Sequence, residues 1–307
     1  MKIFVLEPHE NWICDRLITE WKENNKEITT DNPLEADIIW LLPGWQWRRL
    51  PIELLKNKKV VVTVHHIVPG KFNQQKRKDF FDRDDITDYY HAPCEKTADQ
   101  VTFLTSRPIL VQPFWVNQSL WYPIEDREAL KEKYRIPADR FIIGSFQRDT
   151  EGKDLRSPKL EKGPDQLVEI IKDIVKVKSP QEISVVLSGP RRNYVIRHLT
   201  RNKIPHLYRP NATFEEMNEL YNCLDLYIVA SRYEGGPQAI VECAASKVPI
   251  ISTNVGLAPE ILSEDSIFHS VETYSSAKPN VDVAYDNVKK HFMPDAFASF
   301  VDFFEKI

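Results

Sequence analysis

Short apolar runs alternate with amphipathic stretches along the first third of the chain. Residues 3–6 form one apolar run, and residues 13–21 then place their apolar side chains at the 3.6-residue period of a helix face. Residues 37–42 and 60–64 are again apolar and rich in β-branched side chains, which is typical of buried parallel strands. Strands that alternate with helices predict parallel β-α-β units in an open, doubly wound sheet.

Two weaker strand candidates follow at residues 100–104 and 109–111. The next stretch, residues 113–123, is rich in aromatic residues and proline and has no clear period, so we interpret it as a linker between lobes. We therefore expect a short Rossmann-like lobe over residues 1–118 and a second such lobe over residues 119–285.

The alternation resumes in the second lobe. Residues 164–177 have a helical pattern, and the strand candidates are residues 141–146, 183–187, 226–230 and 249–253. Each of these strand candidates ends in small or turn-forming residues. Ligands of α/β proteins bind outside the carboxyl ends of parallel strands, so we expect the site in the loops that follow these runs.

The last segment, residues 286–307, contains an amphipathic helix. Its apolar side chains recur at positions i, i+3, i+4, i+7 and i+10 from Phe297 to Ile307. A helix with one apolar face needs a surface to cover.

Composition and charge exclude several classes of protein. A length of 307 residues suggests about two domains, and 42% hydrophobic with 28% charged residues is ordinary for a soluble globular protein. A net charge of -4 lacks the basic field of a general nucleic-acid binder. The first apolar run is too short for a signal peptide, and no run is long enough to span a bilayer. The four scattered cysteines form no C-x-x-C pair, so we expect a cytoplasmic protein with reduced thiols.

The segment from Ser231 to Glu242 carries the most chemistry. It follows a buried strand candidate, turns through Gly235 and Gly236, and opens a helix with Pro237 in a first-turn position. Glycines allow a ligand to approach the backbone closely, and a helix N-terminus offers free N–H groups. Such a place suits a pyrophosphate or a sugar hydroxyl.

The two carboxylates of this segment have different positions. Glu234 lies in the loop before the predicted helix, and Glu242 lies more than one turn inside it. They are therefore too far apart to act as an acid/base pair on one helix face. They can instead contact two separate parts of one elongated ligand.

This segment resembles the E-x7-E motif of the family-4 retaining glycosyltransferases. That family has the GT-B fold, in which two Rossmann-like lobes have parallel sheets that face each other across a cleft. The resemblance continues through residues 243–249, Thr253-Asn254-Val255-Gly256 and Pro259-Glu260. It implies that Glu234 holds the hydroxyls of the transferred sugar and that Glu242 holds the ribose hydroxyls. It also implies donor contacts for Gly235, Gly236, Pro237 and Gln238.

Further residues match the family outside this segment. Arg148 and Lys162-Gly163 stand where the family has cations that face the donor diphosphate and stabilise the leaving group. His65, at the end of a strand, stands where the family has an active-site histidine, and His66 is the off-by-one alternative. The resemblance also implies base contacts near Gly189 and Arg209, and a terminal helix that packs back on the first lobe.

Two positions depart from the family pattern. Gly236 occupies a place that commonly holds an aromatic residue, and Lys247 occupies a place that usually holds glycine. The first bears on the identity of the donor sugar, and the second is interpreted as a surface change.

Three other patterns have competing interpretations. Asp82-Arg83-Asp84 matches the D-x-D pattern of a metal-binding glycosyltransferase fold, but no strand precedes it, so we interpret it as a solvated face. The histidines and Cys94 have no zinc-ligand spacing, so no metal site is predicted. Residues 44–78 hold nine lysines and arginines against Glu53 alone. This basic region is either the charged rim of a small lobe, which we favour, or a contact for an anionic lipid surface or a phosphate-bearing acceptor.

The sequence thus predicts a retaining glycosyltransferase that transfers a sugar from a nucleotide-diphosphate sugar to the hydroxyl of a carbohydrate or lipid-linked acceptor. No cofactor and no divalent metal are expected, because Arg148, Lys162 and a helix N-terminus can neutralise the diphosphate. The protein would be cytoplasmic, with peripheral membrane contact as an option and no nucleic-acid partner. The alternatives are a non-catalytic nucleotide-sugar or glycan-binding module and a sugar-nucleotide epimerase of the GT-B fold.

Overall fold

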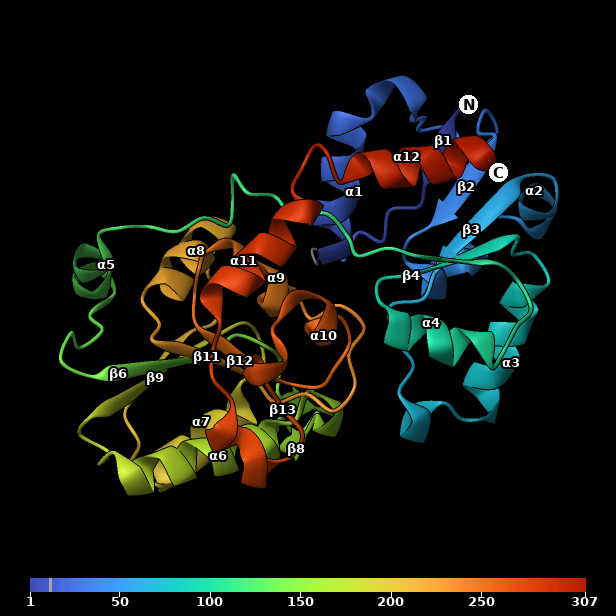
Figure 1. The fold of residues 1–307 in the computed structure, drawn as a ribbon. Coiled ribbons are helices and arrows are strands. Elements are labelled where there is room, and N and C mark those ends of the chain that lie inside the picture. The colour runs from blue at the N-terminus through green and yellow to red at the C-terminus, as the bar shows by residue number, and fades with distance from the viewer. Residues whose placement is uncertain (11–12) are drawn as a thin grey trace. The chain divides into compact units, whose positions relative to one another are not determined.

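The chain folds into two compact α/β units (Figure 1). The structure is a computed structural model that describes residues 1–10 and 13–307. One unit comprises Met1–Trp115 and His291–Ile307, and the other comprises Val116–Lys290. We refer to them as unit 1 and unit 2. Their bounds differ by a few residues from the division expected after residues 118 and 285.

Unit 1 is built on one parallel sheet. Its strands are β1 (Ile3–Val5), β2 (Ile38–Leu41), β3 (Lys59–Thr63), β4 (Tyr89–Ala92) and β5 (Ile109–Val111), and they lie in that order. Its helices are α1 (Ile13–Asn24), α2 (Ile52–Lys56), α3 (Gln74–Asp84), α4 (Glu95–Thr102) and α12 (Phe297–Lys306). The strand runs predicted at residues 37–42, 60–64 and 109–111 are confirmed.

One predicted strand of unit 1 is wrong. Residues 100–104 do not form a strand, because residues 95–102 form helix α4, which buries Ala98 and Val101 on one face and leaves Phe103 88% exposed just beyond its end. The strand of this β-α-β unit is β4 instead, which lies between β3 and β5.

Helix α12 completes the core of unit 1, although it lies at the far end of the chain. Its residues Phe300 and Phe304 pack on Trp40 of β2, with ring centroids 5.5 and 5.2 Å apart. Phe297 and Phe304 also meet Trp21 of α1 edge-on, at 5.8 and 5.7 Å. Figure 1 shows α12 in red beside α1 and over β1 and β2. The amphipathic helix expected between residues 286 and 307 thus covers the aromatic face of this sheet.

A chain of buried hydrogen bonds crosses the centre of the same sheet. Trp40 Nε1 donates to Thr63 Oγ1 at 3.0 Å, and Thr63 Oγ1 lies 3.0 Å from His91 Nδ1. His91 Nε2 lies 2.8 Å from the carbonyl oxygen of Gln112, which can only accept. His91 therefore carries its proton on Nε2 and accepts the Thr63 hydroxyl on Nδ1. Burial lowers the pKa of His91 to about 3, so its ring is neutral.

Unit 2 has a six-stranded parallel sheet. Its strands are β6 (Phe141–Ser145), β9 (Ile183–Ser188), β10 (His206–Arg209), β11 (Leu226–Val229), β12 (Ile250–Thr253) and β13 (Ile267–Phe268). Their order in the sheet is β10-β9-β6-β11-β12-β13. Its helices are α5 (Arg127–Tyr134), α6 (Pro164–Val177), α7 (Asn193–Arg201), α8 (Phe214–Asn222), α9 (Gln238–Ala245), α10 (Ala258–Ile261) and α11 (Val281–Val288). The predicted strands and the predicted helix over residues 164–177 are confirmed, as is the α/β fold class.

The strand order of unit 2 reverses direction once. The chain starts at β6, proceeds outward to β9 and β10, then returns to the other side of β6 for β11, β12 and β13. The connections after β6 and β11 therefore run to opposite sides, and the carboxyl edge between these two strands is the switch point of the sheet. In open α/β sheets such a switch point is where ligands bind.

Candidate functional site

The switch point of unit 2 brings together the loops that follow β6 and β11. Gln147 follows β6, and its side-chain nitrogen donates to the carbonyl oxygen of Lys162 at 2.9 Å. Ser231 follows β11, and its hydroxyl lies 3.3 Å from the side-chain oxygen of Gln147. The two loops and the segment before α6 thus form one hydrogen-bonded site.

Glu234 is the carboxylate at the centre of this site. Its Oε2 forms an ion pair with the ammonium group of Lys162, and its Oε1 accepts a hydrogen bond from Ser231 at 3.1 Å. The side chain is only 8% exposed, so both oxygens are held in place. The structure therefore brings together Glu234 and Lys162, two residues that the resemblance assigned to neighbouring parts of the donor, the sugar and the diphosphate.

Two glycines permit this close packing. Gly163 has φ +60°, and a Cβ there would lie 1.7 Å from the carbonyl oxygen of Ala230 at the end of β11. Gly256 has φ +50°, and a Cβ there would lie 2.0 Å from the carbonyl oxygen of Gly235. Both positions need glycine, because the left-handed conformation and the contact exclude a side chain. Lys162 and Glu234 are thereby held by backbones in direct contact.

Glu242, the second carboxylate of the predicted motif, lies inside α9 and is buried. Its Oε2 accepts a hydrogen bond of 2.8 Å from the hydroxyl of Tyr221 on α8. Burial, with the Glu242 carboxylate as the next cause, raises the pKa of Tyr221 well above its ordinary value. Tyr221 therefore stays protonated and donates, and it fixes the orientation of the carboxylate.

Cations gather beside Glu234. Lys159 lies close enough to Lys162 and Arg148 for both to lower its pKa, although burial is the largest cause of that shift. Its ammonium group is 3.8 Å from Glu161, which is buried. Arg148 Nε donates to the carbonyl oxygen of Thr150 at 3.0 Å. Sequence reasoning missed Lys159, because nothing but its distance from the predicted cations marks it.

The loop after β6 also contains a buried ion pair that the sequence did not reveal. Asp149 accepts hydrogen bonds from the backbone N–H groups of Tyr194 and Val195 at the start of α7, at 3.1 and 3.4 Å. Its carboxylate lies 3.4 Å from Nε of Arg192, which is fully buried. The loop that carries Arg148 is therefore anchored to α7. Residues 149–161 also contain a short hairpin of β7 (Thr150–Glu151) and β8 (Ser157–Pro158).

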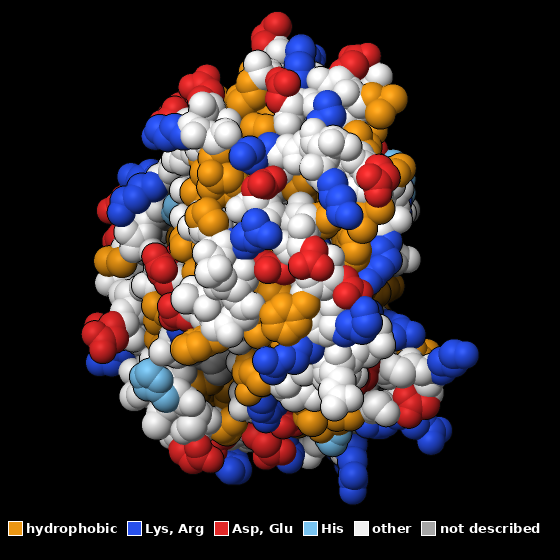
Figure 2. All heavy atoms as spheres, turned by 90° about the vertical axis from the view of Figure 1, so that its right-hand side faces the viewer, with side chains coloured by type: hydrophobic (Ala, Val, Ile, Leu, Met, Phe, Trp, Pro, Cys, Tyr) orange, Lys and Arg blue, Asp and Glu red, His pale blue; other side chains and the backbone are white. Residues whose placement is uncertain are grey.

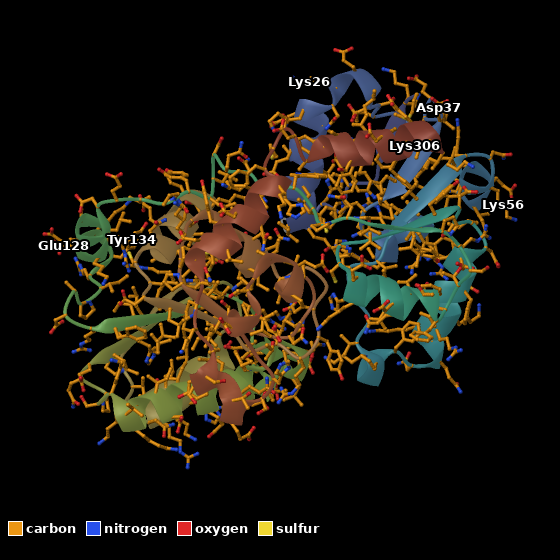
Figure 3. The ribbon with its side chains drawn as sticks, in the orientation of Figure 1. Lys26, Asp37, Lys56, Glu128, Tyr134 and Lys306 are labelled. Atoms are coloured by element: carbon orange, nitrogen blue, oxygen red, sulfur yellow. The ribbon has the colours of Figure 1, made fainter. Side chains whose placement is uncertain are left out.

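The remaining predicted donor residues lie along the same carboxyl edge. Gly189 follows β9 with φ +84°, and its carbonyl oxygen accepts from the hydroxyl of Tyr208 at 3.1 Å. Arg209 ends β10, and its guanidinium lies over the ring of Tyr134, 5.9 Å from the centroid. Tyr134 and Glu128 lie at opposite ends of α5 in Figure 3.

The position of Pro237 differs from the prediction. It was expected in the first turn of the helix, but it precedes α9 as the cap residue, with ψ 109°. The helix begins at Gln238, whose side-chain nitrogen donates to the carbonyl oxygen of Gly236 at 3.3 Å. An extended residue fits this place because the chain changes direction between Gly235 and the helix.

His65 lies in unit 1, directly after β3 and Val64. Its Nε2 donates to the carbonyl oxygen of Leu42 at 2.9 Å, which leaves Nδ1 as the acceptor of the ring. Burial lowers the pKa of His65 to about 4, so the ring is neutral at pH 7. The ring stacks on Phe114, with centroids 5.8 Å apart. His66, the alternative candidate, is exposed.

The competing patterns of unit 1 also have definite structures. Asp82 lies on α3 and forms ion pairs with Arg48 and Lys78, at 3.1 and 2.8 Å, so the D-x-D pattern belongs to a surface charge network.

Among residues 1–10 and 13–307, no three His, Cys, Asp or Glu side chains cluster so that they could hold a metal ion. None of the described helices combines the length and apolarity needed to cross a membrane. On the face drawn in Figure 2, acidic and basic side chains are interspersed over most of the area.

One hollow of unit 1 lies at the amino edge of its sheet, away from the edge where ligands bind. It has a volume of about 550 Å³ and lies beside Asp37, Phe304 and Ile307. Asp37 and Lys56 precede β2 and β3 and mark the amino edge of the sheet, where Lys306 also lies (Figure 3). Because parallel sheets bind ligands at the carboxyl edge, this hollow carries no functional assignment.

Comparison with known proteins agrees with this geometry. Residues 155–277 match the family model described as glycosyl transferases group 1. Among curated protein sequences, none matches this chain. Crystal structures of HepE from Anabaena in complex with UDP and with UDP and glucose superpose with TM-scores of 0.75 and 0.76 over 100% of both chains, at 13% and 12% identity.

Two further solved structures share the fold. Sucrose-phosphate synthase from Thermosynechococcus elongatus has a TM-score of 0.65 at 16% identity, over 98% of this chain and 80% of that one. An α,α-trehalose-phosphate synthase from Burkholderia vietnamiensis has a TM-score of 0.64 at 10% identity, over 86% of this chain and 70% of that one. The chain therefore has the GT-B fold, and its residues 155–277 are similar to the glycosyl transferases group 1.

Proposed function

We propose that this chain is a retaining glycosyltransferase that takes its sugar from a nucleotide-diphosphate sugar bound at the switch point of unit 2. The observation that carries the proposal is that both carboxylates of the motif are held in place, and that Glu234 lies among the cations of the switch point. Glu234 is fixed by Lys162 and Ser231, and Glu242, inside the neighbouring helix, is fixed by Tyr221. In this assignment Glu234 binds hydroxyls of the sugar and Glu242 binds hydroxyls of the ribose.

The proposed reaction is the front-face transfer that the resemblance to the family-4 transferases implies. The acceptor oxygen forms a bond to the anomeric carbon while the bond from that carbon to the diphosphate oxygen breaks on the same face. The acceptor proton passes to the departing diphosphate. Lys162, Lys159 and Arg148 stabilise the negative charge that builds on that oxygen, so the reaction needs no divalent metal. Both oxygens of Glu234 already accept hydrogen bonds, which favours a positioning role over that of a nucleophile.

The choice of donor to test follows from the solved structures. HepE has been crystallised with UDP and with UDP-glucose. UDP and UDP-glucose are therefore the first ligands for thermal-shift measurements, with GDP and ADP and their sugars beside them. A ligand that binds only the folded protein raises its melting temperature.

Two variants test the assigned roles. Glu242→Gln should weaken UDP binding about tenfold or more, because a charged hydrogen-bond acceptor is lost. Glu234→Gln should leave UDP binding nearly unchanged and remove the additional affinity for UDP-glucose. Glu169→Gln on α6 changes an exposed glutamate and serves as the control. If both active-site variants bind UDP and UDP-glucose like the parent, the assignment is wrong.

The reaction class has its own test. With UDP-glucose and no acceptor, a transferase should slowly release UDP and glucose in the presence of EDTA. A binding module would release nothing, and an epimerase would convert the donor to a second nucleotide sugar. With an acceptor, NMR of the product should show the anomeric configuration of the donor, and an inverted product would contradict retention.

A further inference from the structure

Unit 1 contains a second pocket, at the carboxyl edge of its sheet. It has a volume of about 320 Å³ and lies between the segment after β3, which holds His65, and one face of α3. Trp45, in the short helix after β2, forms another part of its wall. Ligand pockets range from roughly 300 to 1,000 Å³, so this one suits a ligand of monosaccharide size.

The floor of this pocket holds a buried positive charge. Arg83 lines the pocket, yet it is only 9% exposed. Its Nη1 donates to the carbonyl oxygen of Gly44 at 3.1 Å, whereas its buried Nε has no hydrogen-bond partner among the described residues. A guanidinium that is removed from water is costly unless an anion or acceptor satisfies it. Arg83 is thus positioned to receive an anionic group.

The face of α3 adds a second cation. Lys76, Phe80 and Arg83 recur at helical spacing, and all three line the pocket. The pocket also contains the carboxylate of Asp79, but Arg48 forms an ion pair with it, and Trp47 Nε1 lies 3.4 Å from the same oxygen. The charge of Asp79 is therefore compensated by a residue outside the pocket lining, and Arg83 and Lys76 leave the pocket cationic.

The opposite wall is aromatic. Trp45 is 50% exposed, and its ring lies 5.5 Å from that of His65. Its Nε1 donates to Glu10 at 3.2 Å, which orients the ring. A partly exposed aromatic face can cover the apolar face of a sugar ring. His65 contributes Nδ1 as a neutral acceptor beside it, because its Nε2 is held by Leu42.

We propose that this pocket binds a phosphorylated monosaccharide as the glycosyl acceptor, with the sugar ring against Trp45 and the phosphate at Arg83 and Lys76. The proposal rests on the proposed function and names its acceptor class. It also divides the basic region at residues 44–78 into two groups. Arg48 and Lys78 are neutralised by carboxylates of α3, whereas Lys76 remains available in the pocket.

The pocket favours a soluble sugar phosphate over a lipid headgroup. A peripheral lipid contact uses several exposed cations at one surface, and here Arg48 is paired with two aspartates. Arg83 instead lines the pocket as a buried side chain, where a compact phosphate fits and a membrane plane does not.

Calorimetric titration of the full chain tests the proposal. The ligands are glucose 6-phosphate, fructose 6-phosphate and mannose 6-phosphate, with the unphosphorylated sugars and inorganic phosphate beside them. At least one sugar phosphate should bind at least about tenfold more tightly than its unphosphorylated form, as expected for one or two charge-assisted hydrogen bonds. Equal binding of both forms would overturn the proposal.

Matched variants on α3 locate the phosphate. Lys76→Ala should weaken sugar-phosphate binding at least about fivefold, whereas Lys78→Ala, two positions along and paired with Asp82, should not. Arg83→Met should abolish the phosphate preference, and burial of the core tryptophans Trp21, Trp40 and Trp115, followed by fluorescence, reports whether unit 1 has folded. Unchanged sugar-phosphate binding in both Lys76→Ala and a folded Arg83→Met overturns the proposal.

Two outcomes separate this inference from the proposed function. If UDP and UDP-glucose bind as expected but no sugar phosphate does, the acceptor assignment fails and the donor site stands. If vesicles of phosphatidylglycerol sediment the chain in a Lys76-dependent manner while sugar phosphates do not bind, the basic face recognises lipid phosphate, and the proposal is overturned.

Discussion

The ammonium group of Lys162 and the carboxylate of Glu234 form an ion pair beside the switch point of the second sheet. The lysine side chain is 19% exposed and the glutamate side chain 8%, so water screens the pair only in part. In the proposed function, Lys162 contacts a phosphate of the donor and Glu234 contacts hydroxyls of its sugar. The ion pair therefore holds both groups where the two ends of the sugar–phosphate bond are expected.

Replacement of Lys162 should lower both the activity and the melting temperature, and a second substitution at Glu234 should restore only the melting temperature. Lys162→Met should lower kcat about 100-fold or more, because a cation that stabilises the leaving group is lost. It should also lower the melting temperature, because Glu234 then keeps a buried charge without its partner. The double variant Lys162→Met/Glu234→Gln should recover much of the melting temperature and none of the activity. Lys176→Met, at an exposed position of α6, is the control.

The hydrogen bond from Tyr221 to Glu242 should influence nucleotide affinity without touching the nucleotide. Tyr221→Phe keeps the ring and leaves a buried carboxylate oxygen without its donor, which costs about 1–3 kcal/mol of unfolding free energy. UDP affinity should fall several-fold, because the carboxylate is no longer oriented. Tyr274→Phe removes a comparable 2.8 Å bond to Asp173, away from the site, and should leave UDP affinity unchanged. Equal UDP affinity in all three proteins would show that Tyr221 has only a structural role.

A methyl group at Gly256 should disrupt the loop that carries Glu234. Gly256→Ala places Cβ 2.0 Å from the carbonyl oxygen of Gly235, at a left-handed φ that alone costs about 1–3 kcal/mol. Urea unfolding should show a loss of that size or larger, and transfer activity should fall with it. Gly70→Ala is the matched control, because nothing lies within 4 Å of its added Cβ. Similar stability losses in the two variants would contradict the assigned contact.

The buried His91 should make the chain sensitive to mild acid. Its pKa is lowered from 6.5 to about 3, so between these values the unfolded state binds a proton that the folded state does not. The contribution of His91 to the free energy of unfolding is therefore fully present above pH 6.5 and is lost as the pH falls toward 3. Between pH 7 and pH 5 this loss amounts to about 2 kcal/mol. Urea unfolding of the parent and of His91→Gln at both pH values should show a smaller loss in the variant. His65, whose pKa is lowered to about 4, should cause a further loss of unfolding free energy in acid, and this loss should occur in both proteins.

Much of the fold could be predicted because its strands are buried on both faces. Runs such as Ile183–Ser188 are buried throughout and mostly apolar, so their composition identifies them without any knowledge of their neighbours. Strand β4 could not be found in this way, because its sequence contains His91 and two tyrosines and therefore lacks an apolar run. His91 is accommodated only because Thr63 and Gln112, from other segments, satisfy its ring nitrogens. These contacts join residues that are far apart in the sequence, so no local pattern predicts them.

In the candidate site, too, residues that belong to a local pattern could be predicted, and residues that depend on long-range contacts could not. Glu234, Glu242 and Lys162 could be proposed because they belong to a local pattern with fixed spacing. Tyr221 could not, because its contact with Glu242 joins α8 to α9 and leaves no periodic signal. Arg83 was interpreted as one residue of a solvated charge run, and only its burial beneath Gly44 distinguishes it from its neighbours.

The packing of Phe297, Phe300 and Phe304 on Trp21 and Trp40 has a consequence for biosynthesis. Unit 1 comprises residues 1–115 and residues 291–307, so its core lacks one aromatic wall until the last of these residues leave the ribosome. The intervening unit is contiguous and can fold during translation, ahead of the segment that was synthesised before it. A nascent chain that ends before residue 291 should therefore keep its early tryptophans accessible to solvent or to a chaperone, even after the second sheet has formed.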